Sequence, residues 1–141
     1  MEPATGARED GSGGGTLPLA VADHPAVAGG IPISGIYDLE PIKLGVLNDA
    51  LQLSDDEVAR LSPFKNIPSR LPPLEVFVGG KERSELQRQA QEYTAAARGR
   101  GLTVNLTTLQ GHHHFSILDE LESPDGALTN AVVQMAAKLG R

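Results

Sequence analysis

The sequence has neither cysteine nor tryptophan among its 141 residues, and aromatic residues make up only 4% of it. Without cysteine there is no disulfide, thiolate metal site or cysteine nucleophile, and a cytoplasmic location is the default expectation. Basic residues are few, 12 against 18 acidic ones, so there is no basic stripe of the kind that binds nucleic acid. No apolar run approaches the roughly 18 residues of a membrane span. We therefore expect neither a nucleic-acid nor a membrane partner.

What the sequence does contain is an alternation of short apolar runs with helical patterns. Strands are expected at residues 29–35, 74–78 and 102–109. Helices are expected at residues 54–62, 84–100 and 125–139, with a weaker helical pattern at 39–51. This order predicts an α/β fold of about three parallel strands with flanking helices, in three layers (α/β/α).

Two of the expected helices begin with a capping signal. Ser54 is followed three residues later by Glu57, and Ser84 is followed by Gln87 in the same way. In such a capping box the two side chains accept hydrogen bonds from amide groups that the first turn leaves without partners.

The first 29 residues differ in composition from the rest of the chain. Residues 11–15 (GSGGG) are polar and glycine-rich, and such a segment buries too little apolar surface to offset the entropy of ordering. We therefore divide the chain into a glycine-rich arm (1–29) and an α/β region (30–141). Three parallel strands leave open edges, so the α/β region is interpreted as one flank of a larger sheet.

A histidine and a carboxylate follow two neighbouring strands of the predicted sheet. His114 lies in the loop after strand 102–109, and Glu82 lies in the loop after strand 74–78. Open α/β sheets present a general base and its acid in loops at this edge. Asp38, after the first strand, is the rival acid, although its setting also suits an ordinary turn residue.

Five short segments together resemble the C-terminal part of α/β-hydrolases, and within them the kynurenine formamidase (arylformamidase) group and related carboxylesterases. The segments are residues 33–42 (ISGIYDLEPI), 62–63 (SP), 78–80 (VGG), 85–89 (ELQRQ) and 114–118 (HFSIL). The resemblance covers about residues 30–136. It implies a triad in the order Ser, Asp or Glu, His, with Glu82 as the acid and His114 as the base. Lys81 departs from the acidic residue that bacterial members often have there.

The resemblance also implies a nucleophile in a G-x-S-x-G turn. Ser12 is the candidate, with Asp10 in place of the first glycine, and the amide of Gly13 is the candidate oxyanion donor. The expected substrate is a small ester or aryl formamide. The His-Gly-Gly oxyanion motif of the group is absent from the sequence. The chain is therefore expected to be a serine hydrolase, or a truncated or degenerate remnant of one, that is weak or inactive alone.

Several alternatives remain open at this point. Ser34 and Ser116 are lesser candidates for the nucleophile, and the neighbouring His112 and His113 are expected to be solvated. Adjacent histidines rarely converge on one ion, so neither a metal nor any other cofactor is expected. The second function considered is a non-catalytic interaction module whose open sheet edge pairs with a second copy or with a complementing N-terminal segment.

Overall fold

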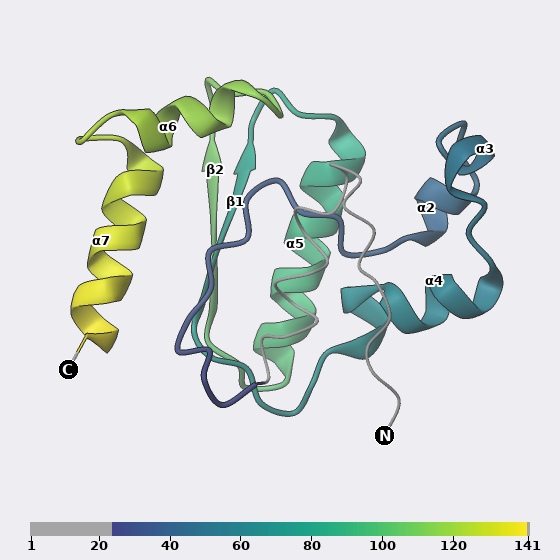
Figure 1. Cartoon of the computed structure of the whole chain (residues 1–141), viewed down its shortest axis with the longest axis horizontal. Coiled ribbons are helices and arrows are strands. Elements are labelled where there is room, and N and C mark those ends of the chain that lie inside the picture. The colour runs from purple at the N-terminus through teal and green to yellow at the C-terminus, as the bar shows by residue number, and fades with distance from the viewer. Residues whose placement is uncertain (1–23, 141) are drawn as a thin grey trace.

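A computed structural model of the chain describes residues 24–140 (Figure 1). Ser12 and Gly13, the predicted nucleophile and oxyanion donor, lie outside the described residues. In chain order the elements are α2 (Glu40–Lys43), α3 (Asn48–Leu51), α4 (Asp55–Leu61), the 3₁₀ turn η1 (Pro63–Asn66), β1 (Leu74–Gly79), α5 (Ser84–Gly99), β2 (Val104–Leu109), the 3₁₀ turn η2 (Ser116–Leu118), α6 (Asp119–Glu122) and α7 (Ala127–Leu139).

Two of the predicted strands pair in parallel. The register of β1 and β2 runs from Leu74 opposite Val104 to Gly79 opposite Leu109. Helix α5 connects the two strands, as a parallel crossover requires. Both strands therefore end at the same edge, where the loops carrying Glu82 and His114 begin.

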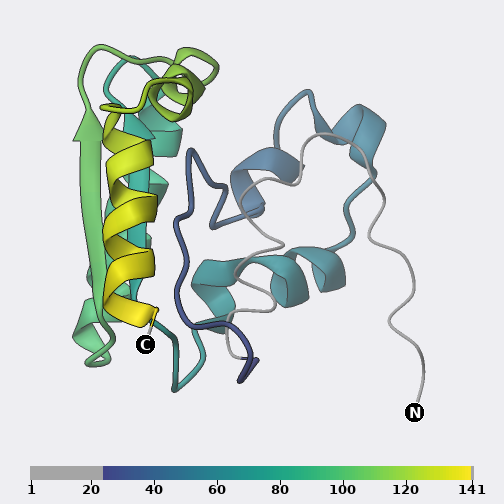
Figure 2. The same ribbon diagram turned by 60° about the vertical axis from the view of Figure 1, so that its left-hand side comes forward.

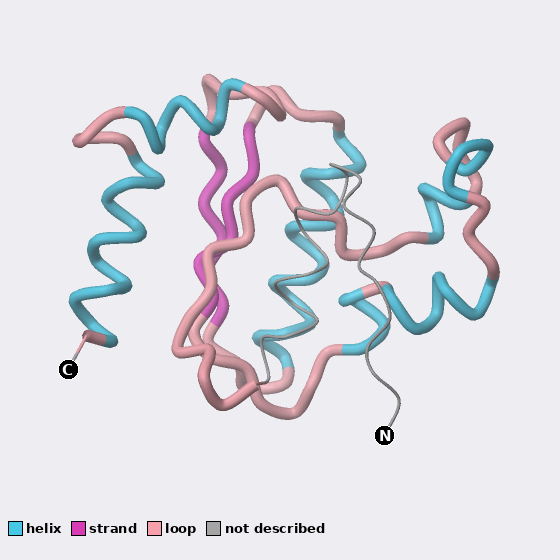
Figure 3. Tube along the Cα trace, viewed as in Figure 1, coloured by secondary structure: helices cyan, strands magenta, loops and turns pink. Residues whose placement is uncertain are grey.

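The third predicted strand, residues 29–35, is replaced by a bridged segment that runs beside β1 and is drawn as a loop in Figure 3. Gly30 N–H donates to the carbonyl of Pro73 (3.0 Å), and Ser34 N–H donates to the carbonyl of Phe77 (2.8 Å). Pro32 has no N–H and leaves the ladder one bond short. The parallel course was predicted correctly, but the sheet has two regular strands instead of three among the described residues.

The sheet is covered on both faces. Successive strand residues point to opposite faces, so Val76 and Val78 pack with Tyr93 of α5, whereas Phe77 packs with Leu128 of α7. Figures 1 and 2 show α5 and α7 on either side of the two strands. The predicted α/β class with helices on both faces is therefore confirmed.

Helix α7 contacts the sheet mainly through its first turns. Leu128 is fully buried, and Ala131 is partly buried against the same cluster. Farther along the helix a groove of about 470 Å³ separates α7 from the strands, and its lining includes Asn105 and Met135. Leu128 is therefore the main anchor of this helix.

The helix ends agree only in part with the capping signals. Ser54 and Glu57 form the predicted capping box at α4. At α5 the box is absent, because Ser84 is the first helical residue and the side-chain amide of Gln87 donates to the carbonyl of Glu82 (2.8 Å). The weak pattern at 39–51 forms two short helices, α2 and α3, instead of one.

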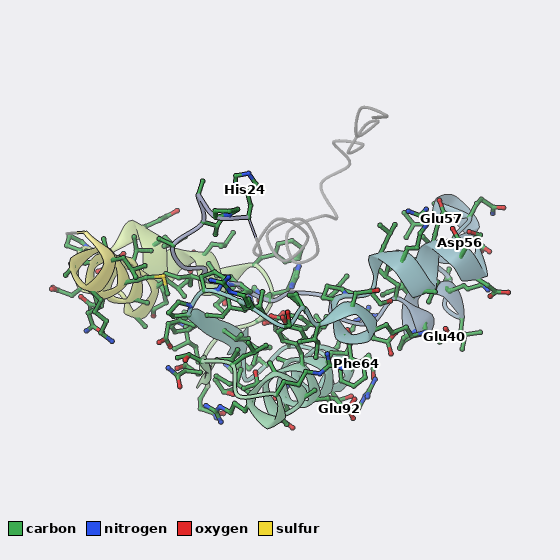
Figure 4. All side chains as sticks on the ribbon, turned by 90° about the horizontal axis from the view of Figure 1, so that it is seen from below. His24, Glu40, Asp56, Glu57, Phe64 and Glu92 are labelled. Carbon is green, nitrogen blue, oxygen red and sulfur yellow. The ribbon has the colours of Figure 1, made fainter. Side chains whose placement is uncertain are left out.

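Helices α2, α3 and α4 project away from the sheet (Figure 2). Figure 4 shows the acidic side chains of Glu40, Asp56 and Glu57 at this end of the molecule. Glu40 pairs with Lys65 (3.3 Å), and Asp56 pairs with Arg60 (2.8 Å). No helix within residues 24–140 has both the length and the apolar character needed to cross a membrane.

Candidate acid–base site

Glu82 is held in place by the end of β1. The loop turns back at Gly79, whose carbonyl accepts the N–H of Glu82 (3.1 Å). Oε2 of Glu82 then accepts two hydrogen bonds, from Gly79 N–H (2.6 Å) and from the Ser34 hydroxyl (2.6 Å). The Glu82 side chain is fully buried. A buried carboxylate needs such donors, since an unpaired buried charge is strongly destabilising.

His114 meets this carboxylate from the loop after β2. Its Nδ1 lies 2.8 Å from Oε1 of Glu82. A carboxylate in its ionised form can only accept hydrogen bonds, and opposite such an acceptor a neutral imidazole has its proton on Nδ1 and a lone pair on Nε2. The His114 side chain is 51% exposed, in contrast to its partner. The arrangement is that of an oriented base that can accept a proton from outside.

Ser34 is a member of this site that was considered only as a nucleophile. Its backbone has φ +52°, in the left-handed region, at the end of the segment bridged to β1. Its hydroxyl donates to Glu82, on the side of the acid away from the base. Ser34 therefore stabilises the acid. The signal in the sequence was its place at the carboxyl end of a segment parallel to β1, the edge where Glu82 was also predicted.

Asp38 does not join the site in the way a rival acid would. Its Oδ1 accepts the N–H of Glu40 (3.0 Å), a local turn contact. The only acid that the described residues bring to His114 is thus Glu82.

The two histidines before His114 differ from one another. His113 is exposed, as predicted. The expectation that His112 is solvated was wrong: its ring is 22% exposed, with Nδ1 3.2 Å from the Ser116 hydroxyl and Nε2 2.9 Å from Oε1 of Glu120. Local sequence patterns do not reveal this contact, because Glu120 lies eight residues away and is brought back by the turn into α6.

An exposed aromatic side chain packs against the ring of His114. Phe115 is 77% exposed and packs edge-on against the His114 ring, with 5.3 Å between ring centroids and 83° between planes. Leu118 and Leu121 are also exposed on the following turns. An apolar substrate group beside His114 would therefore find an apolar contact in Phe115.

Two stacked tyrosines lie in the core on the α5 face of β1. The rings of Tyr37 and Tyr93 are 4.6 Å apart, centroid to centroid, and nearly parallel. Burial, followed by the charges of Tyr93 and Glu82, raises the pKa of Tyr37 well above its ordinary value of 10. Burial alone raises the pKa of Tyr93 to about 12. Both phenols therefore stay neutral at physiological pH and serve as packing groups.

Titratable side chains elsewhere in residues 24–140 do not form a metal centre. No three His, Asp or Glu side chains of this part of the chain are grouped as an ion would need.

The fold is shared with known hydrolases. An esterase/lipase from an uncultured bacterium matches with a TM-score of 0.62 at 23% identity, over 88% of this chain and 47% of that one. Acylaminoacyl peptidase from Pyrococcus horikoshii matches with a TM-score of 0.66 at 12% identity, over 88% of this chain and 22% of that one. The chain has part of an α/β-hydrolase fold.

Comparison of sequences adds a particular group of proteins. The chain is similar to kynurenine formamidases, with 29% identity to the Danio rerio protein over 119 residues and 30% to the Salmo salar protein over 120 residues. In both cases the match covers 81% of this chain but only 41% of the relative. No family model matches the sequence.

Proposed function

We propose that this chain carries the acid and base of a serine hydrolase that cleaves a small ester or an aryl formamide. The observation that carries the proposal is the buried Glu82 carboxylate, which holds Nδ1 of His114 and leaves Nε2 free. The similarity to kynurenine formamidases and the hydrolase fold support this class of reaction. No cofactor takes part in the proposed reaction. A cytoplasmic location stays a prediction.

The nucleophile in this proposal is Ser12. Its Oγ attacks the carbonyl carbon of the substrate while Nε2 of His114 accepts the hydroxyl proton, and Gly13 N–H donates to the oxyanion. His114 then gives the proton to the departing alcohol or amine. Water, activated by His114, hydrolyses the acyl- or formyl-serine, releases the acid and restores Ser12.

The proposed activity of the chain alone is low. Gly13 is the one assigned oxyanion donor, and removal of one such donor typically costs about 10²–10³ in rate. Full activity comparable to that of a complete hydrolase would contradict this part of the proposal.

The test is labelling with a fluorophosphonate probe, followed by mass mapping of peptides. We expect label on Ser12 that disappears in His114→Ala. The peptide map also reports Ser34 and Ser116, so label on either of these would refute the assignment of Ser12. No label on a chain shown to be folded by circular dichroism would refute the catalytic proposal.

A second candidate function rests on the outer side of the bridged segment. Residues 30–34 use the backbone groups of Gly30, Pro32 and Ser34 to pair with β1, and within the described residues no strand lies beyond them. The backbone N–H and C=O groups of Ile31 and Ile33, which alternate with these, point away from β1. They suit pairing with a strand from a second copy or from a complementing segment. Light scattering after size-exclusion chromatography tests pairing with a second copy by measuring the molar mass of the eluted protein. The mass of a monomer at all concentrations would contradict such pairing.

A further inference from the structure

His112 connects the two loops of the acid–base site through its backbone. Its carbonyl accepts the N–H of Lys81 (2.9 Å), which directly precedes Glu82. The approach is so close that a Cβ at Gly79 would overlap the same carbonyl oxygen. The residue two positions before the base is therefore fixed against the loop of the acid.

The side chain of the same residue reaches in another direction. Nε2 of His112 lies 2.9 Å from Oε1 of Glu120, while Oε2 of Glu120 accepts the N–H of Ala127 (2.6 Å), the first residue of α7. That hydrogen bond, followed by the one from His112, lowers the pKa of Glu120. The Glu120 carboxylate is thus ionised at neutral pH and accepts a proton from Nε2 of His112.

The remaining nitrogen closes the network inside the His114 loop. With its proton on Nε2, His112 accepts the Ser116 hydroxyl at Nδ1 (3.2 Å). The same hydroxyl oxygen accepts the N–H of His113 (3.0 Å), directly before the base. His112 therefore contacts the turn after His114 through Ser116, and through Glu120 it joins this turn to the start of α7.

We propose that His112 is a positioning residue, which holds the loop of His114 so that Nδ1 stays on Glu82. The catalytic consequence rests on the proposed hydrolase function, but the positioning itself is a property of the described residues. The same contacts have a competing interpretation, in which Ser116 is the nucleophile of a serine hydrolase and His112 is its base. Fluorophosphonate label on Ser116 would support that interpretation.

The experiment follows the proton between His114 and Glu82 by NMR. A proton between imidazole Nδ1 and a carboxylate gives a downfield resonance, which is recorded at low temperature because the His114 ring is 51% exposed and its proton exchanges with water. The His114→Ala variant assigns this resonance by its loss. We expect this resonance to disappear in His112→Ala and in His112→Asn. We expect it to survive in His112→Gln, because the side-chain amide of Gln places a donor near the position of imidazole Nε2 and can still bond Glu120.

His24→Ala is the matched control and should keep the resonance, since the exposed His24 ring accepts the N–H of Ala26 and, within residues 24–140, no hydrogen bond joins it to the loops of the acid and the base. A resonance that survives in both His112→Ala and His112→Asn would overturn the proposal, as would its loss in a folded His112→Gln. If His112→Ala does not fold, the comparison of His112→Asn with His112→Gln tests the proposal. Labelling of Ser12 is measured separately, so that a positioning role without catalysis, and catalysis without a positioning role, give different results.

Discussion

Replacing Glu82 by Gln changes one atom of a buried side chain and is expected to move a proton on His114. In the native site one carboxylate oxygen accepts the N–H of Gly79 and the hydroxyl of Ser34. A backbone N–H can only donate, so the carbonyl oxygen of Gln must take this position. The new NH₂ group then faces Nδ1 of His114, which must become the acceptor.

The consequence for the base follows from its two nitrogens. When Nδ1 accepts, the ring proton of neutral His114 lies on Nε2, and the nitrogen that faces outward can no longer take a proton. In serine proteases this wrong tautomer costs about 10⁴ in rate, which corresponds to about 5.4 kcal/mol of activation free energy. Stability should change less, by about 1–3 kcal/mol, because a charged hydrogen-bond acceptor becomes a neutral one of the same size.

Long-range ¹H–¹⁵N correlation spectra distinguish the two tautomers of His114 directly and need no substrate. The rate of fluorophosphonate labelling then measures the loss of the base. Glu85→Gln, on the exposed side of α5 beside Arg88, is the control and should leave the tautomer unchanged. A Glu82→Gln chain that is folded and keeps the proton on Nδ1 would refute the reasoning.

Three further results are expected. Ser34→Ala removes a donor to the buried carboxylate and should lower the free energy of unfolding by about 1.5–3 kcal/mol in urea titrations; no change would mean that Ser34 does not stabilise the acid. Leu128→Ala should cost about 2–5 kcal/mol, whereas Val133→Ala on the same helix, at 61% exposure, should stay within about 0.5 kcal/mol; equal costs would contradict the anchoring of α7 by Leu128. The pKa of Glu120 is lowered from 4.5 by its hydrogen bonds from Ala127 and then His112, so its contribution is complete above pH 4.5 and is lost as the pH falls through the lowered pKa. In thermal unfolding, the native chain should have a higher melting temperature than Glu120→Gln near neutral pH, and this difference should vanish in acid. A difference that is the same at every pH would refute the contribution assigned to the ionised Glu120.

The strands and the acid–base pair could be predicted because they depend on local patterns and on a general property of parallel sheets. The apolar runs fixed β1 and β2 to within two residues, and the shared edge of parallel strands placed Glu82 near His114. Ser54 and Glu57 were predicted because both partners of a capping box lie within one turn.

The features that were missed depend on contacts between distant segments. Ser84 does not cap α5, since Gln87 turns to the carbonyl of Glu82 instead. Helix α7 begins two residues later than predicted, because the acceptor for its first N–H is Glu120, seven residues earlier. The role of Ser34 requires a residue 48 positions away. Periodicity and composition carry no information on such pairs.

The hydrogen bonds that hold Glu82 and His114 have a consequence for protein engineering. The donors to the acid are a backbone amide and a neighbouring hydroxyl, and the base rests on the acid itself. The Glu82–His114 half of the proposed catalytic site is thus held together by contacts among the described residues alone. In a Ser12→Ala variant, serine, threonine or cysteine side chains supplied by designed partner peptides could then be compared one at a time beside the same proposed proton acceptor.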